Sequence, residues 1–375
     1  MTDKNIQLIS TISEDNKLTL ALQEISMPQP NPDEIVVRIE AAPINPSDLG
    51  VMLSAADFTT AQQSGSEYSP TITADFPAKL MPAVAMRIGQ NTPVGNEGAG
   101  TVISAGSSPE AQALIGKTVA VIGGGTYRQY LCTHIKSCLV LNEGTTAKEG
   151  ASSFINPLTA LAMVETMKAE GHKAIIHAAA ASNLGQMLNR ICIADGVDLI
   201  NIVRKEEQAT LLRNLGAKYV VNSSSTTFMA DLTAAIMETG ATIAFDPIGG
   251  GQLTSDMMTC MEKAITHDVK EHTIYGSNTF KQVYIYGALD RGPITLNRSF
   301  GFAWSVSGFL LFNALGKLAP ATVTAMRQRV TDEITTTFAS HYTHEVSLKE
   351  ALHLSSLKTY AKQATGEKYL ITPQV

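Results

Sequence analysis

Charged residues are scarce in this sequence, and no apolar run is long enough to span a bilayer. Lysine, arginine, aspartate and glutamate make up 17% of the 375 residues, and the formal net charge is -6. This balance provides no basic surface for nucleic acid or for an anionic membrane. The polar opening MTDKNIQ lacks the pattern of a signal peptide. We therefore expect a cytoplasmic protein with neither nucleic acid nor membrane as a partner.

Cysteine is also rare. The four cysteines, Cys132, Cys138, Cys192 and Cys260, show no C-x-x-C spacing, so the sequence indicates neither a disulfide framework nor a structural zinc lobe. The chain is longer than one hydrophobic core usually organises, which predicts two domains.

The stretch from Lys173 to Lys205 reads as strand, tight turn, helix and strand. The apolar run Ala174 to Ala179 is continuous, as in a parallel strand covered on both faces. A helix is predicted to begin near Leu184 and to end at Asp195-Gly196, before a second strand from Val197 to Val203. This order is typical of the first unit of a dinucleotide-binding fold, although a βαβ unit of an unrelated α/β protein has the same pattern.

The turn of this unit is the first candidate cofactor site. Of the glycine fingerprint G-x-G-x-x-G only the last glycine, Gly185, is present, and Ala181, Ser182, Asn183 and Leu184 precede it. Backbone N–H groups at a helix N-terminus can bind a pyrophosphate, and Ser182 and Asn183 can cap the helix. We therefore predict that these five residues contact the cofactor phosphates.

Arg204 and Lys205 follow the second strand, where an NAD site would carry an acidic residue for the ribose 2′-hydroxyl. A guanidinium forms charge-assisted hydrogen bonds with a 2′-phosphate, so this pair favours NADPH over NADH. The alternative is that both side chains are solvated in a loop before a helix.

The remaining segments predict a mixed α/β protein. Residues 1–150 contain short strands separated by Pro, Gly and Asn turns, whereas strands and helices alternate after the first βαβ unit. Val51 to Pro93 is polar and too long for an ordinary loop, so we expect either a lid over the active site or a surface insertion.

Several stretches resemble the zinc-free branch of the medium-chain dehydrogenase/reductase superfamily, which includes quinone-oxidoreductase-like and enoyl-reductase-like enzymes. The stretches are, in order, INPSD (44–48), PVGNEGAGTV (93–102), NPLTAL (156–161), ASNLGQ (181–186), INIVRK (200–205), LGAKYVVN (215–222), FDPIGG (245–250) and TGEKYLI (365–371).

The resemblance implies a GroES-like catalytic domain at 1–150, a doubly wound Rossmann domain at 151–308 and a C-terminal segment at 309–375 that completes the catalytic domain. Zinc-dependent relatives carry Cys, His and Cys where this chain has Asn45, Asn96 and Asn156. Because amides are poor zinc ligands, we expect no catalytic metal.

The resemblance also implies further site residues. It places Asn45 and Thr159 at the catalytic centre, and Asn222, Tyr286 and Gly287 at the cofactor. Three of these residues have an ordinary structural alternative: Asn45 can stabilise a turn, Thr159 can bond within its helix, and Tyr286 can belong to the core.

The substrate is predicted to be a small molecule, with a quinone as the first choice. Enoyl-reductase relatives carry a tyrosine shortly after the NPSD turn, and here the nearest tyrosine is Tyr68 in the polar segment. A quinone needs no dedicated proton donor, because its hydroquinone anion is stabilised. Reduction of an enoyl thioester or enone stays as the alternative, and a structural NADPH-binding protein is the alternative of another class.

The last expectation is a homodimer. The strand Gln282 to Gly287 is predicted to lie at the far edge of the Rossmann sheet, and an exposed edge of such composition invites pairing.

Overall fold

The computed structural model describes residues 4–66, 69–269, 274–362 and 367–375. The chain divides into a β-rich unit, residues 1–155 and 329–375, and a parallel-sheet unit, residues 156–328. Residues 309–328, assigned to the C-terminal segment from the sequence, thus belong to the parallel-sheet unit. Tyr68 and the Thr365-Gly366 part of TGEKYLI lie outside the described residues. In the described part of the chain, no helix is both long and apolar enough to cross a membrane.

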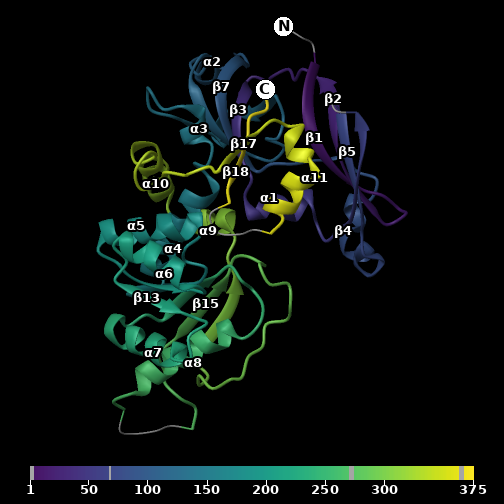
Figure 1. Cartoon of the computed structure of the whole chain (residues 1–375). Coiled ribbons are helices and arrows are strands. Elements are labelled where there is room, and N and C mark those ends of the chain that lie inside the picture. Colours follow the sequence, from purple (N-terminus) through teal and green to yellow (C-terminus); the bar gives the residue numbers. More distant parts are fainter. Residues whose placement is uncertain (1–3, 67–68, 270–273, 363–366) are drawn as a thin grey trace. The chain divides into compact units, whose positions relative to one another are not determined.

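The β-rich unit is built from two sheets (Figure 1). The first runs in the order β4-β5-β2-β1-β6, with bounds Asp57–Ser66, Ser69–Asp75, Lys17–Ser26, Lys4–Ile12 and Thr92–Pro93. The second sheet runs in the order β10-β8-β7-β3-β18-β17, and β9 (Tyr130–His134) also pairs with β3. In that order the strands span Cys138–Val140, Thr118–Ile122, Glu97–Ala105, Glu34–Pro43, Tyr369–Ile371 and His344–Val346. The helical segments are α1 (Pro46–Met52), η1 (Ala78–Arg87), α2 (Pro109–Gln112), η2 (Ile135–Ser137), α3 (Ala147–Gly150), η3 (Glu350–Leu352) and α11 (Leu354–Tyr360).

The C-terminal strand β18 completes the second sheet. It pairs antiparallel to β3, with Leu370 opposite Pro43, and parallel to β17. Leu370 and Ile371 are fully buried, so the end of the chain contributes to the same core as its first strands. A truncated chain would leave the side of β3 that pairs with β18 uncovered.

The segment 51–93 is not the loop that its polar composition predicts. Strands β4 and β5 form a hairpin, and β5 pairs with β2, so the first sheet is extended. Pro70, Ile72 and Ala74 alternate with more exposed residues and face the core. The surface insertion is therefore the alternative that the structure favours, because a long lid loop is absent from the described residues of this segment.

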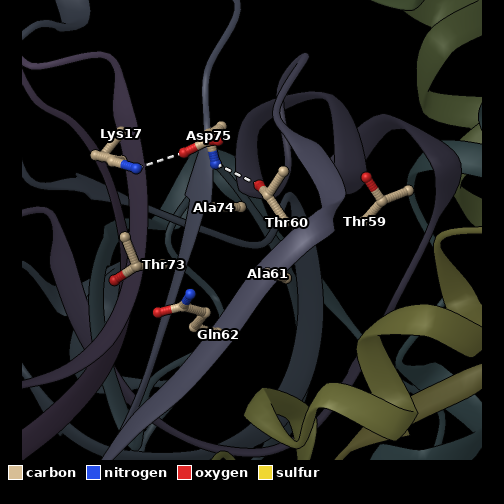
Figure 2. Close-up of a pocket in the computed structure, with 8 residues that line it drawn as sticks. All are labelled: Lys17, Thr59, Thr60, Ala61, Gln62, Thr73, Ala74 and Asp75. Carbon is tan, nitrogen blue, oxygen red and sulfur yellow. Dashed lines mark hydrogen bonds and ion pairs between the residues drawn. The ribbon is translucent and has the colours of Figure 1, made fainter.

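A hollow of about 400 Å³ lies on this hairpin, between β2, β4 and β5 (Figure 2). Lys17 pairs with Asp75 at its rim, and the Asp75 backbone N–H donates to Thr60 Oγ1 at 2.9 Å. The β4–β5 register shifts between Asp57 and Gln62, and residues of this irregular stretch line the hollow. None of the site residues predicted from the sequence lines it.

The parallel-sheet unit has strand order β13-β12-β11-β14-β15-β16. The strands span Tyr219–Asn222, Asp198–Val203, Ala174–His177, Ile243–Asp246, Lys281–Ile285 and Trp304–Gly308. The helices are α4 (Ile155–Ala169), α5 (Asn183–Asp195), α6 (Glu206–Asn214), α7 (Phe228–Thr239), α8 (Leu253–Thr266), α9 (Leu311–Lys317) and α10 (Pro320–Asp332), of which α4 and α10 cross the division between the units. Helix α5 ends at Gly196 in the left-handed conformation, as the Asp-Gly signal predicts.

The prediction that residues 282–287 form the far edge of this sheet is wrong. Strand β16 pairs in parallel with β15, with Val306 opposite Val283, and takes the edge position. Residues 286–303 lie between the two strands in the chain, so local sequence does not reveal this pairing.

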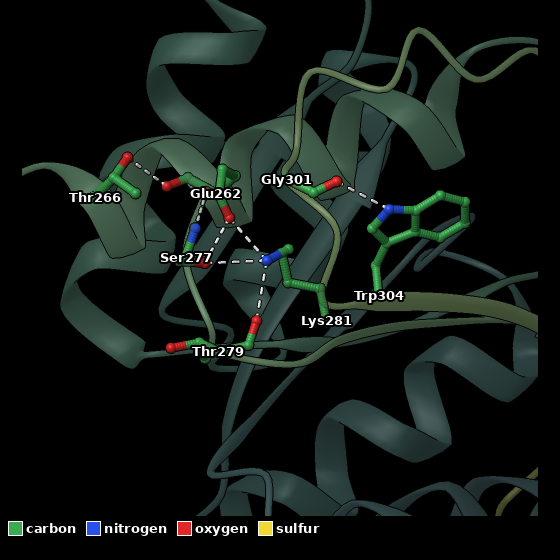
Figure 3. Close-up of polar contacts among 7 residues, drawn as sticks. All are labelled: Glu262, Thr266, Ser277, Thr279, Lys281, Gly301 and Trp304. Atoms are coloured by element: carbon green, nitrogen blue, oxygen red, sulfur yellow. Dashed lines mark hydrogen bonds and ion pairs between the residues drawn. The ribbon is translucent and has the colours of Figure 1, made fainter. Parts of the chain in front are cut away.

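A buried ion pair joins β15 to α8 (Figure 3). Lys281 Nζ lies 2.7 Å from Glu262 Oε2, and the Lys281 side chain is 0% exposed. The ammonium also donates to the Thr279 carbonyl at 2.9 Å, while Ser277 donates to Glu262 through its N–H and its hydroxyl. Because a buried charge needs such a set of partners, this cluster fixes the chain that leads into β15.

Candidate active site

The dinucleotide turn follows β11 and opens α5. Ala179 has a φ of +49°, a left-handed conformation, and Ser182 caps the helix by accepting a hydrogen bond from the Gly185 N–H at 3.2 Å. A Cβ at Gly185 would lie 2.2 Å from the Ala180 carbonyl oxygen. Glycine is therefore required for the close packing of helix and strand, as the third glycine of the fingerprint is.

Four further cofactor candidates lie at the carboxyl ends of strands in the same unit. Arg204 and Lys205 are exposed after β12, and Gln208 Oε1 accepts from both of their backbone N–H groups, at 3.1 and 3.2 Å. Asn222 ends β13, paired in register with Val203. Tyr286 directly follows β15. The structure thus brings these residues to one edge of the sheet, because parallel strands end on the same side.

Gly287 is packed against the chain after β14. A Cβ at this position would lie 2.4 Å from the Pro247 carbonyl oxygen. The Tyr286 backbone N–H donates to the Asp246 carbonyl at 3.0 Å, so the end of β15 is fixed in place.

Sequence reasoning missed His177, the last residue of β11. Its ring is fully buried, its Nε2 lies 2.7 Å from Tyr286 Oη, and the two rings stack at 5.9 Å. Burial lowers the pKa of His177 to about 3, so the ring is neutral. The sequence feature that could have identified His177 is that it is the one polar residue within an otherwise apolar predicted strand.

Asn45 belongs to the β-rich unit and is held by a buried carboxylate, that of Glu97. Asn45 Nδ2 donates to Glu97 Oε1 at 2.7 Å. Glu97 Oε2 accepts from the backbone N–H groups of Phe154 and Ile155, both at 2.9 Å, at the start of α4. Glu97 is therefore a fixed anchor for Asn45 and a capping anion for α4.

Asp48 is the second buried carboxylate of this cluster. Its Oδ2 accepts from the Asn45 N–H at 2.7 Å and its Oδ1 from the Asn96 N–H at 2.8 Å. Burial, with the nearby charge of Glu97, raises the pKa of Asp48 to about 7. Two of the three asparagines at the zinc-ligand positions are thus oriented by one side chain.

The ammonium of Lys368 interacts with both of these carboxylates. Burial lowers the pKa of Lys368 to about 8, and the charges of Glu97 and Asp48 oppose this shift. Its Nζ donates to Ser152 Oγ at 3.0 Å, and Ser152 Oγ lies 2.9 Å from Tyr342 Oη. This polar cluster can hold an amide in one orientation and can exchange a proton with hydroxyl groups.

Thr159 and Asn156 lie on α4, in the parallel-sheet unit, and Thr159 is buried. Asn96 Nδ2 donates to Ser47 Oγ at 3.1 Å in the β-rich unit. Among the described residues, no three His, Cys, Asp or Glu side chains group as metal ligands.

The fold was compared with solved structures. A candidate NADPH:quinone reductase from Mesorhizobium loti superposes with a TM-score of 0.74 and 23% sequence identity, over 100% of this chain and 99% of that one. The complex of Etr1p with NADP and crotonyl-CoA gives a TM-score of 0.68 at 18% identity, over 98% and 99% of the two chains. The chain has the medium-chain dehydrogenase/reductase fold. The β-rich unit is its GroES-like domain and the parallel-sheet unit its Rossmann domain.

Sequence comparison gives weaker likeness over part of the chain. A mitochondrial enoyl-[acyl-carrier-protein] reductase of Caenorhabditis elegans is 29% identical over 201 residues, which are 52% of this chain and 50% of that protein. The chain spans about half the length of the curated relatives it matches. No family model matches the sequence.

Proposed function

We propose that this chain is an NADPH-dependent oxidoreductase that transfers hydride to a small, activated acceptor. The observation that carries the proposal is the turn after β11, where Ser182 caps α5 and Gly185 packs on Ala180, followed by Arg204 at the end of β12. The structural neighbours include a complex with NADP and one with NADPH. When bound, the reduced nicotinamide supplies the hydride, while the protein orients the cofactor and excludes water.

Within this proposal Ala181 to Gly185 contact the phosphates, and Arg204 and Lys205 contact the 2′-phosphate. Asn222 lines the adenosine side, whereas Tyr286 and Gly287 line the nicotinamide side. Asn45 and Thr159 act at the catalytic centre, where Glu97 holds the Asn45 amide in one orientation.

Arg204→Ala is expected to remove most of the preference for NADPH over NADH. A charge-assisted hydrogen bond contributes about 1.5–3 kcal/mol, which corresponds to roughly a ten- to hundredfold change in affinity. The matched control is Arg213→Ala, because Arg213 is a half-exposed arginine of the same unit that pairs with Glu206. Fluorescence titration of both cofactors against the three proteins gives the dissociation constants. Equal affinities of the native protein for NADPH and NADH would sink the cofactor assignment.

The acceptor that we propose first is a quinone. No tyrosine follows the NPSD turn directly, and a hydroquinone anion needs no protein acid to be stable. An enoyl thioester is the second candidate, because the curated relatives include enoyl-[acyl-carrier-protein] reductases. Comparing kcat/KM for a 1,4-quinone and for an enoyl thioester separates the two, and a higher value for the thioester would reverse their order.

We also propose a homodimer. Because β16 and not β15 is the edge strand of the parallel sheet, we place the dimer contact at β16. An unpaired strand edge is a template for pairing with a second copy. Lysine substituted for Ser305 should convert the dimer to a monomer, because a charge on an edge strand disfavours pairing with a second copy. Ser305 lies on the strand face opposite Val306, so the packing of Val306 on the core is kept. Small-angle scattering at micromolar concentration reports the mass, and a monomeric native protein would refute this proposal.

A further inference from the structure

His177 and Tyr286 form a polar pair on the buried face of the parallel sheet. His177 pairs in register with Phe245 of β14, and Phe245 with Tyr284 of β15, so all three side chains lie on one face. Tyr286, two positions after Tyr284, continues that face beyond the end of β15. The pair therefore stands at the carboxyl ends of β11 and β15, on either side of β14.

This position is where the strand order reverses. Strand β11 is followed in the chain by β12 on one side and is paired with β14 on the other. Open α/β sheets bind their ligands outside the carboxyl ends of the strands at this switch point. Tyr286 is partly exposed as a residue at this end of the sheet, whereas His177 is fully buried.

The protonation of the pair follows from an unpartnered atom. His177 Nδ1 is buried and has no hydrogen-bond partner among the described residues. A proton on Nδ1 would leave a buried N–H without an acceptor, which is rarer in proteins than an unpaired acceptor. The tautomer with the proton on Nε2 avoids this, and Nε2–H then donates to Tyr286 Oη across the 2.7 Å contact.

Tyr286 is consequently an acceptor from His177, and its own proton is available. No second partner of Tyr286 Oη is found in the part of the chain that the structure describes. Burial, with the charge of Asp246, raises the pKa of Tyr286, so the hydroxyl keeps its proton at neutral pH.

We infer that the Tyr286 hydroxyl donates a hydrogen bond to the carboxamide oxygen of the bound nicotinamide, and that His177 is the positioning residue that directs this proton outward. The inference rests on the proposed binding of NADPH. It assigns a side-chain contact at the nicotinamide end of the site, apart from the phosphate contacts of the turn.

The test compares NADPH with 2′-phospho-ADP-ribose, which has the same phosphates but no nicotinamide. Tyr286→Phe should raise the Kd for NADPH about five- to tenfold and leave the Kd for the fragment unchanged. The thionicotinamide analogue of NADPH, whose sulfur is a weak acceptor, should bind the native protein and Tyr286→Phe about equally. If native protein binds neither NADPH nor the fragment, the proposed function fails before this inference is reached.

His177→Phe replaces the imidazole with a somewhat larger apolar ring and removes the Nε2–H donor. It should raise the Kd for NADPH about threefold, because the hydroxyl is no longer held. If the His177 proton were instead on Nδ1, Tyr286 would donate its hydrogen bond to His177 Nε2. His177→Phe would then free the Tyr286 hydroxyl and lower the Kd for NADPH. Tighter binding would overturn the inference, and so would a Tyr286→Phe variant with an unchanged Kd and a reduced kcat. Nitrogen NMR of His177 provides an independent check, with Nε2 expected to carry the proton.

Discussion

Replacing Glu97 by glutamine is expected to destabilise the β-rich unit by about 2–4 kcal/mol. The Glu97 carboxylate accepts from Asn45 Nδ2, Phe154 N–H and Ile155 N–H and has no exposed surface. Glutamine keeps the shape but presents an NH₂ group toward at least one of these donors. A buried donor is then left unsatisfied, and the favourable interaction of the negative charge with the start of α4 is lost.

Hydrogen exchange at Phe154 and Ile155 measures this effect locally, because both amides lose protection when the bond to Glu97 opens. The matched control is Glu143→Gln, since Glu143 is an exposed glutamate of the same unit, and its effect should stay within about 0.5 kcal/mol. Unchanged protection of both amides in Glu97→Gln would mean that the carboxylate does not hold them.

The second large effect is expected for Lys281→Met. Removal of the ammonium leaves the Glu262 carboxylate in a buried site with only the Ser277 donors, and breaking a buried pair in this way costs about 3–5 kcal/mol. Trp304, the single tryptophan of the sequence, lies at the start of β16 in the same unit, so its fluorescence reports the unfolding of this unit. Urea unfolding followed at this residue gives the change.

Two further variants isolate the cause. The double variant Lys281→Met with Glu262→Gln removes both charges and keeps an acceptor for Ser277, so it should regain more than half of the lost stability. Lys168→Met breaks the exposed pair with Glu165 and should cost less than about 1 kcal/mol. If the double variant is no more stable than Lys281→Met, the stability lost in Lys281→Met comes mainly from altered packing and not from the uncompensated charge of Glu262.

Local signals predicted the elements around the cofactor site well. The continuous apolar run before Ala178, the cap at Ser182 and the Asp195-Gly196 stop define β11 and α5, and the structure places them within one or two residues of the predicted bounds. These features depend on neighbours in sequence, such as a capping hydroxyl or a glycine with positive φ.

Long-range pairing was not predictable in the same way. Thr71 to Asp75 alternates as a strand should, but nothing in the sequence indicates that it pairs with β2, fifty or more residues earlier. The polar β4 strand hides the hairpin further, because its exposed residues suggest a loop. Strand β16 was missed for a related reason, since Trp304 to Gly308 is short and far in the chain from its partner β15.

The polar groups behind the predicted site residues were also missed. Glu97 lies within the recognised GNEG stretch, yet only the fold shows that its carboxylate anchors Asn45 and the start of α4. His177 looked like part of a buried strand, and its contact with Tyr286 spans 109 residues. In both cases the sequence predicted the residue at the proposed site, Asn45 or Tyr286. Only the tertiary structure shows the residue that orients it, Glu97 or His177.

The central claim is that the chain transfers hydride from NADPH to an activated acceptor. The most direct measurement mixes NADPH-saturated protein with a 1,4-quinone, and separately with an enone and an enoyl thioester, and follows the absorbance of the reduced nicotinamide. We predict loss of this absorbance with at least one acceptor at a rate proportional to protein concentration, and no loss without acceptor. NADPH that binds but is never oxidised in any of the mixtures would contradict the account and would favour a structural NADPH-binding protein.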